Sequence, residues 1–282
     1  MTTFRTYYTL FIMALALLML PPMAKADDND DLYLSTVEKA DEAIAKSDWA
    51  SAEKLLLEAI KLKPGNPANA MLISNLGIVR FNAGHDSLAL STLNDAVDLV
   101  PTSTTLLKNR AMILSAMNRE REAFNDYTKI ISLDSTLVEP RFYHAMIAMR
   151  NADLATAESD FFAMQRMAPD NRLTNIGLAT FYSTTRQHEK AIPFLNKVLE
   201  TDKEPEYYGA RALCYIFTDR LNEASADIAD ALKADPTYAE IYIYRALLNQ
   251  RRFRPEDAKR DAQRAIELGA NPRYVKSIIV EK

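Results

Sequence analysis

Cysteine and glycine are the scarce residues of this 282-residue sequence. It contains one cysteine, Cys214, so no disulfide can form within a single chain. There are 6 glycines against 40 alanines, so the residue that tight turns favour is rare and a strong helix former is abundant. The net charge of −4 is small, and no basic stripe with interleaved aromatic residues occurs. The sequence therefore disfavours a disulfide-stapled fold, a β-rich fold and nucleic-acid binding.

Motifs for catalysis, cofactors and metals are also missing from the sequence. The three histidines, His85, His144 and His188, lie far apart and lack metal-ligand spacing. There is no glycine-rich phosphate loop, no Gly-x-Ser-x-Gly and no cysteine pair. Cys214 lies beside Tyr215 in an apolar stripe, which is typical of a small buried residue. We therefore predict a protein that is not an enzyme and has no cofactor or metal.

The first 26 residues predict a secretory signal peptide. Arg5 precedes an apolar run that ends near Leu20, and an Ala-Lys-Ala sequence at 24–26 offers a cleavage site. Cleavage would make the protein periplasmic or secreted, with possible envelope association and no integral membrane span left. The alternative is an uncleaved anchor, because the apolar stretch 7–23 is just long enough to span a bilayer. Residues 27–32, which are mostly acidic, are expected to form a flexible tail.

A repeat of small residues is the strongest pattern in the chain. Pairs of small residues twelve positions apart recur, and the second members of successive pairs are separated by 37, 34, 34, 34, 33 and 34 residues. A period of this length predicts stacked helical hairpins. Small side chains at both sites let two antiparallel helices approach closely. The pairs are Ala40 and Ala52, Gly77 and Ala89, Ala111 and Ala123, Ala145 and Ala157, Ala179 and Ala191, Ala212 and Ala224, and Ala246 and Ala258.

These units resemble the tetratricopeptide repeat. The run Leu76-Gly77, Ala89, Leu93, Ala96 and Pro101 is similar to the family pattern, and residues 211–236 repeat it. The resemblance covers 33–271 and implies an all-α, right-handed superhelix whose first helices line a concave groove. Residues 272–282 are expected to form a capping helix on the last unit. The seven expected units are 33–66, 70–103, 104–137, 138–171, 172–204, 205–238 and 239–271.

The groove implied by the resemblance predicts where partners bind. Residues at fixed offsets from the first small site are expected to face the groove, and many of them are apolar. A flexible, methionine-rich surface suits varied protein or peptide partners; part of this set could instead be buried between units. The family's two-carboxylate clamp is not expected, because Met112 and Tyr143 stand where it needs polar groups. The candidate groove residues are Phe81, Lys108, Met112, Phe142, Met146, Met149, Ile176, Leu213 and Ile243.

Two function classes remain open at the level of sequence. The favoured one is a non-catalytic scaffold or adaptor for protein partners in the periplasm or cell envelope. The alternative is a glycan- or peptidoglycan-associated protein, for which Tyr207, Tyr208, Tyr242 and Tyr244 are the candidate platform. A cluster of basic residues in 245–264 is expected to be a solvated face, or else to dock an acidic partner or anionic surface. Partner, pathway and oligomeric state are not specified by the sequence.

Overall fold

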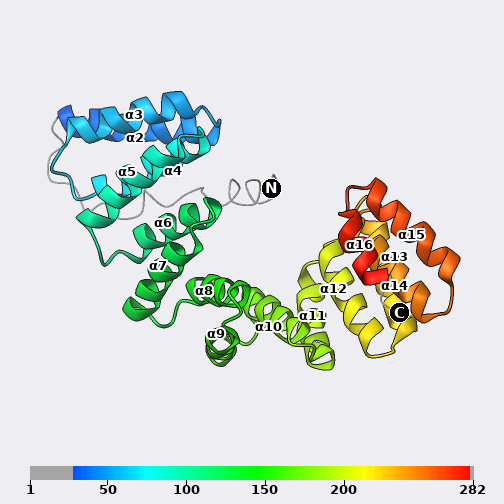
Figure 1. The fold of residues 1–282 in the computed structure, drawn as a ribbon. Coiled ribbons are helices and arrows are strands. Elements are labelled where there is room, and N and C mark those ends of the chain that lie inside the picture. The colour runs from blue at the N-terminus through cyan, green and yellow to red at the C-terminus, as the bar shows by residue number, and fades with distance from the viewer. Residues whose placement is uncertain (1–27, 280–282) are drawn as a thin grey trace. The chain divides into compact units, whose positions relative to one another are not determined.

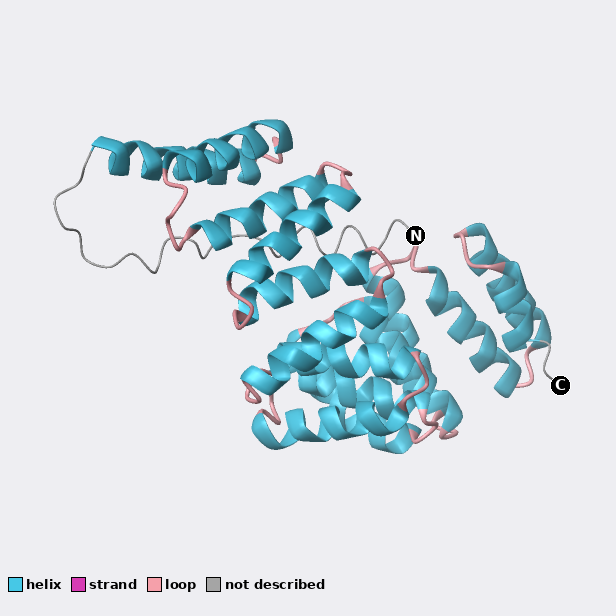
Figure 2. Cartoon of the chain, turned by 60° about the vertical axis from the view of Figure 1, so that its left-hand side comes forward, coloured by secondary structure: helices cyan, strands magenta, loops and turns pink. Residues whose placement is uncertain are grey.

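The computed structural model describes residues 28–279, and every regular element in that range is an α-helix (Figures 1 and 2). The predicted signal peptide lies outside the described residues. The fifteen described helices form antiparallel hairpin pairs followed by one short last helix, which confirms the predicted helical-hairpin solenoid. Their bounds are α2 Asp28–Ala45, α3 Trp49–Leu62, α4 Asn69–Asn82, α5 Asp86–Leu99, α6 Thr104–Ala116, α7 Glu120–Leu133, α8 Val138–Arg150, α9 Leu154–Met167, α10 Arg172–Thr184, α11 His188–Thr201, α12 Pro205–Phe217, α13 Leu221–Ala234, α14 Ala239–Arg251, α15 Pro255–Glu267 and α16 Pro272–Ile279.

The chain divides into two compact units, which are described separately. Unit 1 ends at Ile147 and unit 2 begins at Ala148, so the division falls within α8. In unit 1, hairpins α2–α3, α4–α5 and α6–α7 follow one another, and α3 contacts α4 as α5 contacts α6. In unit 2, α11 contacts α12 and α13 contacts α14 in the same manner. Each hairpin therefore uses a neighbour to cover its apolar face, as repeat arrays require.

The predicted small sites lie at the helix crossings. The alanines of the seven pairs are all at most 3% exposed, and Gly77 is buried as well. A Cβ atom on Gly77 would lie 2.6 Å from Cγ of Leu93 and 3.2 Å from the carbonyl oxygen of Ala89, both on α5. Real Cβ atoms do not approach carbon so closely, so α4 and α5 pack at a distance that only glycine permits here. This confirms the packing role inferred from the spacing.

Proline ends several of the second helices, as the sequence predicts. A proline restricts the residue before it and cannot continue the hydrogen-bond ladder, so the helix stops just upstream. Four second helices end two residues before a proline: α3 at Leu62 before Pro64, α5 at Leu99 before Pro101, α9 at Met167 before Pro169, and α13 at Ala234 before Pro236.

The turn inside each hairpin has one residue in the left-handed region, always seven positions after the first small residue. Its φ lies between 55° and 60° in six turns and is 87° at the glycine. This single residue reverses the chain with few connecting residues. The seven residues are Ser47, Gly84, Asn118, Ala152, Arg186, Asp219 and Phe253.

The two ends of the described chain differ in part from expectation. The predicted acidic flexible tail at 27–32 is wrong from Asp28 onward, because α2 begins there. Acidic side chains are favourable at a helix N-terminus, and Asp30 also forms an ion pair with Lys63. At the other end, α16 is the predicted capping helix. Its Val275 is 1% exposed and packs with Ile243 of α14, although Tyr274 is 51% exposed.

Candidate functional site

The candidate site is the face presented by the first helix of each hairpin. In unit 1 the structure brings together only part of the predicted set. Phe81 is 5% exposed and packs with Leu93 and Ile113, so its prediction as a groove residue is wrong. Ile113 of the neighbouring hairpin covers this ring. The position of Phe81 within its own repeat does not predict that contact.

The remaining predicted residues of unit 1 are half-buried side chains on α6 and α8, two first helices that a polar contact links. Met112 on α6 and Phe142 and Met146 on α8 are all partly exposed. Lys108 donates a hydrogen bond to Glu139 of α8 over 3.1 Å, which ties α6 to α8 at this face. Next to it, Asn109 donates to Oγ of Ser74 over 3.0 Å. These polar contacts fix the first helices relative to one another and leave the methionine and phenylalanine side chains accessible.

In unit 2 the predicted residues again separate into two groups. Met149 on α8, Ile176 on α10 and Leu213 on α12 are half-buried and remain accessible. Ile243 on α14 is 1% exposed because it packs with Ala265 and the capping helix, so its prediction as a groove residue is wrong. Ile176 and Ile243 both lie three residues before the first small residue of their hairpins. The Ile176 side chain is nevertheless partly exposed, whereas the Ile243 side chain is covered.

A recurrent buried ion pair crosses the hairpins and was not predicted from the sequence. Its arginine precedes the first small residue, and its aspartate lies sixteen residues later on the second helix. Both Arg110 with Asp126 and Arg211 with Asp227 form two hydrogen bonds, at 2.8 and 2.6 Å. The aspartate side chains are 7% and 5% exposed. The third pair joins Arg245 to Asp261.

These pairs explain polar residues in an otherwise apolar stripe. Hydrogen bonding to the aspartate raises the pKa of the Arg211 guanidinium, and likewise that of Arg110. Each of these two arginines also donates to an asparagine on the preceding second helix, Asn196 over 2.7 Å and Asn94 over 3.0 Å. One arginine therefore links three helices. The sixteen-residue Arg–Asp spacing in three units is the sequence signal that would have found them.

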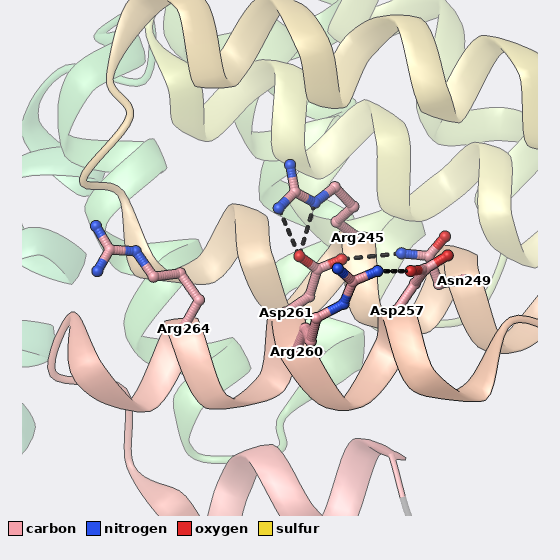
Figure 3. A pocket seen from close by; sticks show the side chains of 6 residues that line it. All are labelled: Arg245, Asn249, Asp257, Arg260, Asp261 and Arg264. Atoms are coloured by element: carbon pink, nitrogen blue, oxygen red, sulfur yellow. Dashed lines mark hydrogen bonds and ion pairs between the residues drawn. The ribbon is translucent and has the colours of Figure 1, made fainter.

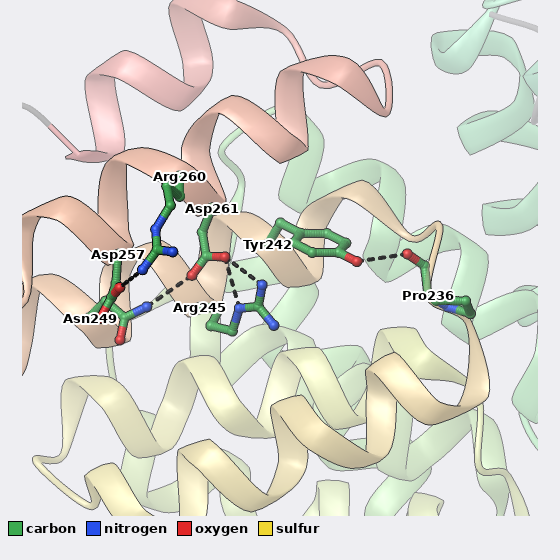
Figure 4. A network of polar contacts seen from close by, with 7 residues as sticks. All are labelled: Pro236, Tyr242, Arg245, Asn249, Asp257, Arg260 and Asp261. Atoms are coloured by element: carbon green, nitrogen blue, oxygen red, sulfur yellow. Dashed lines mark hydrogen bonds and ion pairs between the residues drawn. The ribbon is translucent and has the colours of Figure 1, made fainter.

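The last hairpin bears an open polar hollow lined by Arg245, Asn249, Asp257, Arg260, Asp261 and Arg264 (Figure 3). Within it, Arg245 and Asn249 both donate to Asp261, and Arg260 is paired with Asp257 (Figure 4). Arg264 forms an ion pair with Glu267. Each arginine that lines the hollow is thus paired with a carboxylate of the same hairpin. This pairing favours a solvated structural face for this part of the basic cluster over a docking surface.

The tyrosines of the glycan alternative are engaged in contacts within unit 2. The hydroxyl of Tyr207 accepts a hydrogen bond from Arg172 over 2.9 Å. Tyr208 and Tyr244 pack against the core of α10–α14, and burial raises the pKa of the Tyr244 hydroxyl. Tyr242 donates to the carbonyl oxygen of Pro236 over 2.9 Å (Figure 4). Nothing in these contacts favours a stacked sugar.

Residues considered as catalytic or metal-binding have packing roles. Nε2 of His144 lies 3.0 Å from Oγ1 of Thr128, and its ring stacks on Phe124 at 3.9 Å between centroids. Cys214 is buried, and burial raises the pKa of its thiol, so the thiolate is disfavoured. Within 28–279 there is no cluster of three metal-ligating side chains. None of the helices described is sufficiently long and apolar to cross a bilayer.

Comparison with known proteins identifies the repeats. A family model described as a tetratricopeptide repeat matches residues 174–205 and 205–238, both in unit 2. The chain is similar to DnaJ homolog subfamily C member 3 of Mus musculus and of Homo sapiens, at 28% and 29% identity over 184 residues. These residues are 58% of this chain and 36% of each relative, so the chain spans about a third of their length.

Solved structures share the architecture. A tetratricopeptide repeat protein from Parabacteroides merdae superposes with a TM-score of 0.69 at 23% identity, over 89% of this chain and 98% of that one. Pseudomonas aeruginosa pilF gives a TM-score of 0.62 at 13% identity, over 76% and 97%. YrrB, a TPR protein with an unusual peptide-binding site, gives 0.52 at 19% identity, over 66% and 96%. Residues 174–238 thus match two tetratricopeptide repeats, and the described helices share the fold of solved tetratricopeptide repeat structures.

Proposed function

We propose that the protein is an exported, non-catalytic scaffold that holds a polypeptide partner along the first helices of its repeats. The observation that supports this most is the accessible apolar surface of Met112, Phe142 and Met146 in unit 1. Methionine side chains adapt to partners of different shape, and a surface of this kind accepts the apolar face of a helix or an extended peptide.

The polar edge of this surface would orient the partner. The Lys108–Glu139 pair has side chains that are 30% and 32% exposed, so both remain accessible to hydrogen-bonding groups of a bound chain. The main-chain amides of an extended peptide supply such groups. The peptide-binding site of YrrB provides a precedent in a protein of related fold, without fixing which residues act here.

The experiment is site-specific photocrosslinking in the native cell. A benzoylphenylalanine placed at Met112 or Met146 should form a defined adduct with a partner protein. The matched control places it at Leu99, an apolar second-helix residue that is 60% exposed. Phe142→Ser with Met146→Ser should abolish the adduct at Met112, whereas Leu99→Ser with Leu133→Ser should not. Adducts of equal yield at Met112 and Leu99 would contradict the proposal.

The export part of the proposal rests on residues 1–26. Fusion of this segment to alkaline phosphatase should give an active enzyme, because the phosphatase needs disulfides that form outside the cytoplasm. Mass spectrometry of the purified protein should then find an N-terminus at Asp27. An intact N-terminus on a membrane-bound protein would favour the anchor alternative, and an inactive fusion would contradict export.

A further inference from the structure

The turn between α14 and α15 bears an aromatic side chain in a costly place. Phe253 is 93% exposed and has a φ of 58°. A bulky residue in the left-handed region is strained by about 1 kcal/mol or more, because Cβ crowds the following carbonyl. Exposure of the ring to water adds to that cost. The equivalent turns of α4–α5 and α6–α7 use Gly84 and Asn118, which suit this conformation. Turn formation therefore does not explain the phenylalanine.

The turn is tied to the preceding hairpin through the residue next to Phe253. One amino group of the Arg252 guanidinium donates to the carbonyl oxygen of Leu221 over 2.7 Å and to Oδ1 of Asn222 over 3.2 Å. Both acceptors lie at the start of α13, so the tip of the α14–α15 hairpin is joined to the preceding α12–α13 hairpin. In addition, the guanidinium of Arg251 lies 6.0 Å from the ring centroid of Phe217, and Phe217 is itself 47% exposed. Two successive hairpins therefore each bear an exposed phenylalanine at the tip.

The surroundings of Phe253 are strongly basic. Residues 251–260 hold five basic and two acidic side chains, in a protein whose net charge is −4. The two acids, Glu256 and Asp257, are matched by ion pairs with Lys259 and Arg260. Among the described residues, no carboxylate forms an ion pair with Arg251 or Arg254. These two cations therefore lie on either side of the exposed ring in sequence, and neither forms an ion pair within the described chain.

We propose that this tip, formed by Phe217, Arg251, Phe253 and Arg254, docks onto an anionic phospholipid bilayer. An aromatic ring at the apex of a convex turn inserts at the level of the headgroups, while flanking arginines contact lipid phosphates. A bilayer yields to a protruding ring and needs no preformed cavity, whereas a protein partner would have to supply a matching pocket. The charge is local, so the acidic remainder of the protein stays in solution.

Vesicle flotation tests the proposal on the chain from Asp27 onward, which retains every described helix. The chain should partition onto vesicles of phosphatidylcholine with phosphatidylglycerol and much less onto phosphatidylcholine alone. Phe253→Asn should weaken partitioning about tenfold, since the buried ring area is lost. Arg251→Gln and Arg254→Gln should each weaken it about fivefold, and added salt should weaken it further.

Two matched controls separate docking at this tip from general adsorption. Arg119→Gln removes the same charge from the α6–α7 turn, where Arg119 is paired with Glu122 at 2.6 Å. Leu99→Ser removes an exposed apolar side chain from a second helix. Both should leave partitioning unchanged. Asparagine suits the left-handed turn, so Phe253→Asn should keep the native circular dichroism spectrum and melting temperature or raise the latter.

Fluorescence provides an independent test of the same docking. In Phe253→Trp the new indole should shift its emission to the blue when phosphatidylglycerol vesicles are added, above the constant background of Trp49. Equal partitioning of Phe253→Asn and the parent chain would overturn the proposal, as would the lack of any preference for anionic vesicles. The proposed scaffold function is tested on unit 1, so either result leaves it standing.

Discussion

The hairpin turns of unit 1 and unit 2 have the same backbone but very different side chains. Unit 1 places serine, glycine and asparagine at the left-handed position, whereas unit 2 places alanine, arginine, aspartate and phenylalanine there. Glycine and asparagine relieve the strain of this conformation, and most of the unit 2 residues do not. The geometry is the same in both, so the contacts between the helices impose the turn. The side chain at the turn is then free to serve another purpose.

The two units also differ in how visible the repeat is in the sequence. The family model matches only residues of unit 2, although the hairpins of unit 1 are built in the same way. In unit 1, Arg80 of α4 forms polar contacts with two neighbouring helices. The structure shows that it donates to Glu53 of α3 over 2.8 Å and to Thr92 of α5 over 2.6 Å. These polar contacts join α3, α4 and α5 in a part of the chain that the family model does not match.

The largest loss of stability is expected at Gly177 in unit 2, where close packing requires a residue without a side chain. A Cβ on Gly177 of α10 would lie 2.6 Å from Cδ1 of Phe161, and that ring is fully buried. Gly177→Val should lower the free energy of unfolding by about 3 kcal/mol, because overpacking displaces the ring. Urea denaturation with hydrogen exchange should place the loss in unit 2. Gly65→Ala, a substitution into open space in unit 1, is the control and should cost little.

A smaller loss of stability is expected when the Arg–Asp ion pair within either unit is broken, and it should be the same size in both units. Asp227→Ala in unit 2 and Asp126→Ala in unit 1 each leave an arginine without its carboxylate. Each should lower the free energy of unfolding by about 2–3 kcal/mol. Lys259→Gln, which breaks an exposed pair, should change it by less than about 0.5 kcal/mol. A loss in one unit only would mean that the pair has different structural roles in the two.

Exchange of turn residues would test the first comparison directly. Phe253→Asn should raise the free energy of unfolding by up to about 1 kcal/mol, and Asn118→Phe should lower it by a similar amount. Thermal melts followed by circular dichroism measure both. Opposite signs would show that unit 2 tolerates strain at its turn; destabilisation by both would indicate that Phe253 has packing contacts that its exposure does not suggest.

The smallest effect concerns pH and is confined to unit 2. Burial, together with the charge of Arg186, lowers the pKa of His188 below its usual value near 6.5. The ring stacks on Phe217 at 4.6 Å between centroids. The folded protein resists protonating this ring, whereas the unfolded chain takes up a proton below about pH 6.5. Stability should therefore fall as the pH decreases through that value, and His188→Phe should reduce the fall. A titration by nuclear magnetic resonance that gives a pKa above 6.5 would contradict this.

The sequence predicted the fold because its evidence is local and repeated. A small residue every 34 positions, with a partner twelve residues later, marks the helix crossings that the structure contains. The candidate site was predicted less well. Phe81 and Met112 were both assigned to the groove from their offsets, yet one is covered by the next hairpin and the other is accessible. Burial at these positions depends on neighbouring side chains, and the repeat pattern does not specify those.

The sequence by itself determined the helical hairpins, the close helix crossings at alanine and glycine, and the helix ends before proline. Each of these features depends on residues within a single repeat. Only the tertiary structure decided which first-helix residues stay accessible, that three Arg–Asp pairs cross the hairpins, and that Phe253 stands exposed beside Arg251 and Arg254. Those outcomes depend on side chains brought together from different helices. Their distances and exposure arise only when the hairpins have packed.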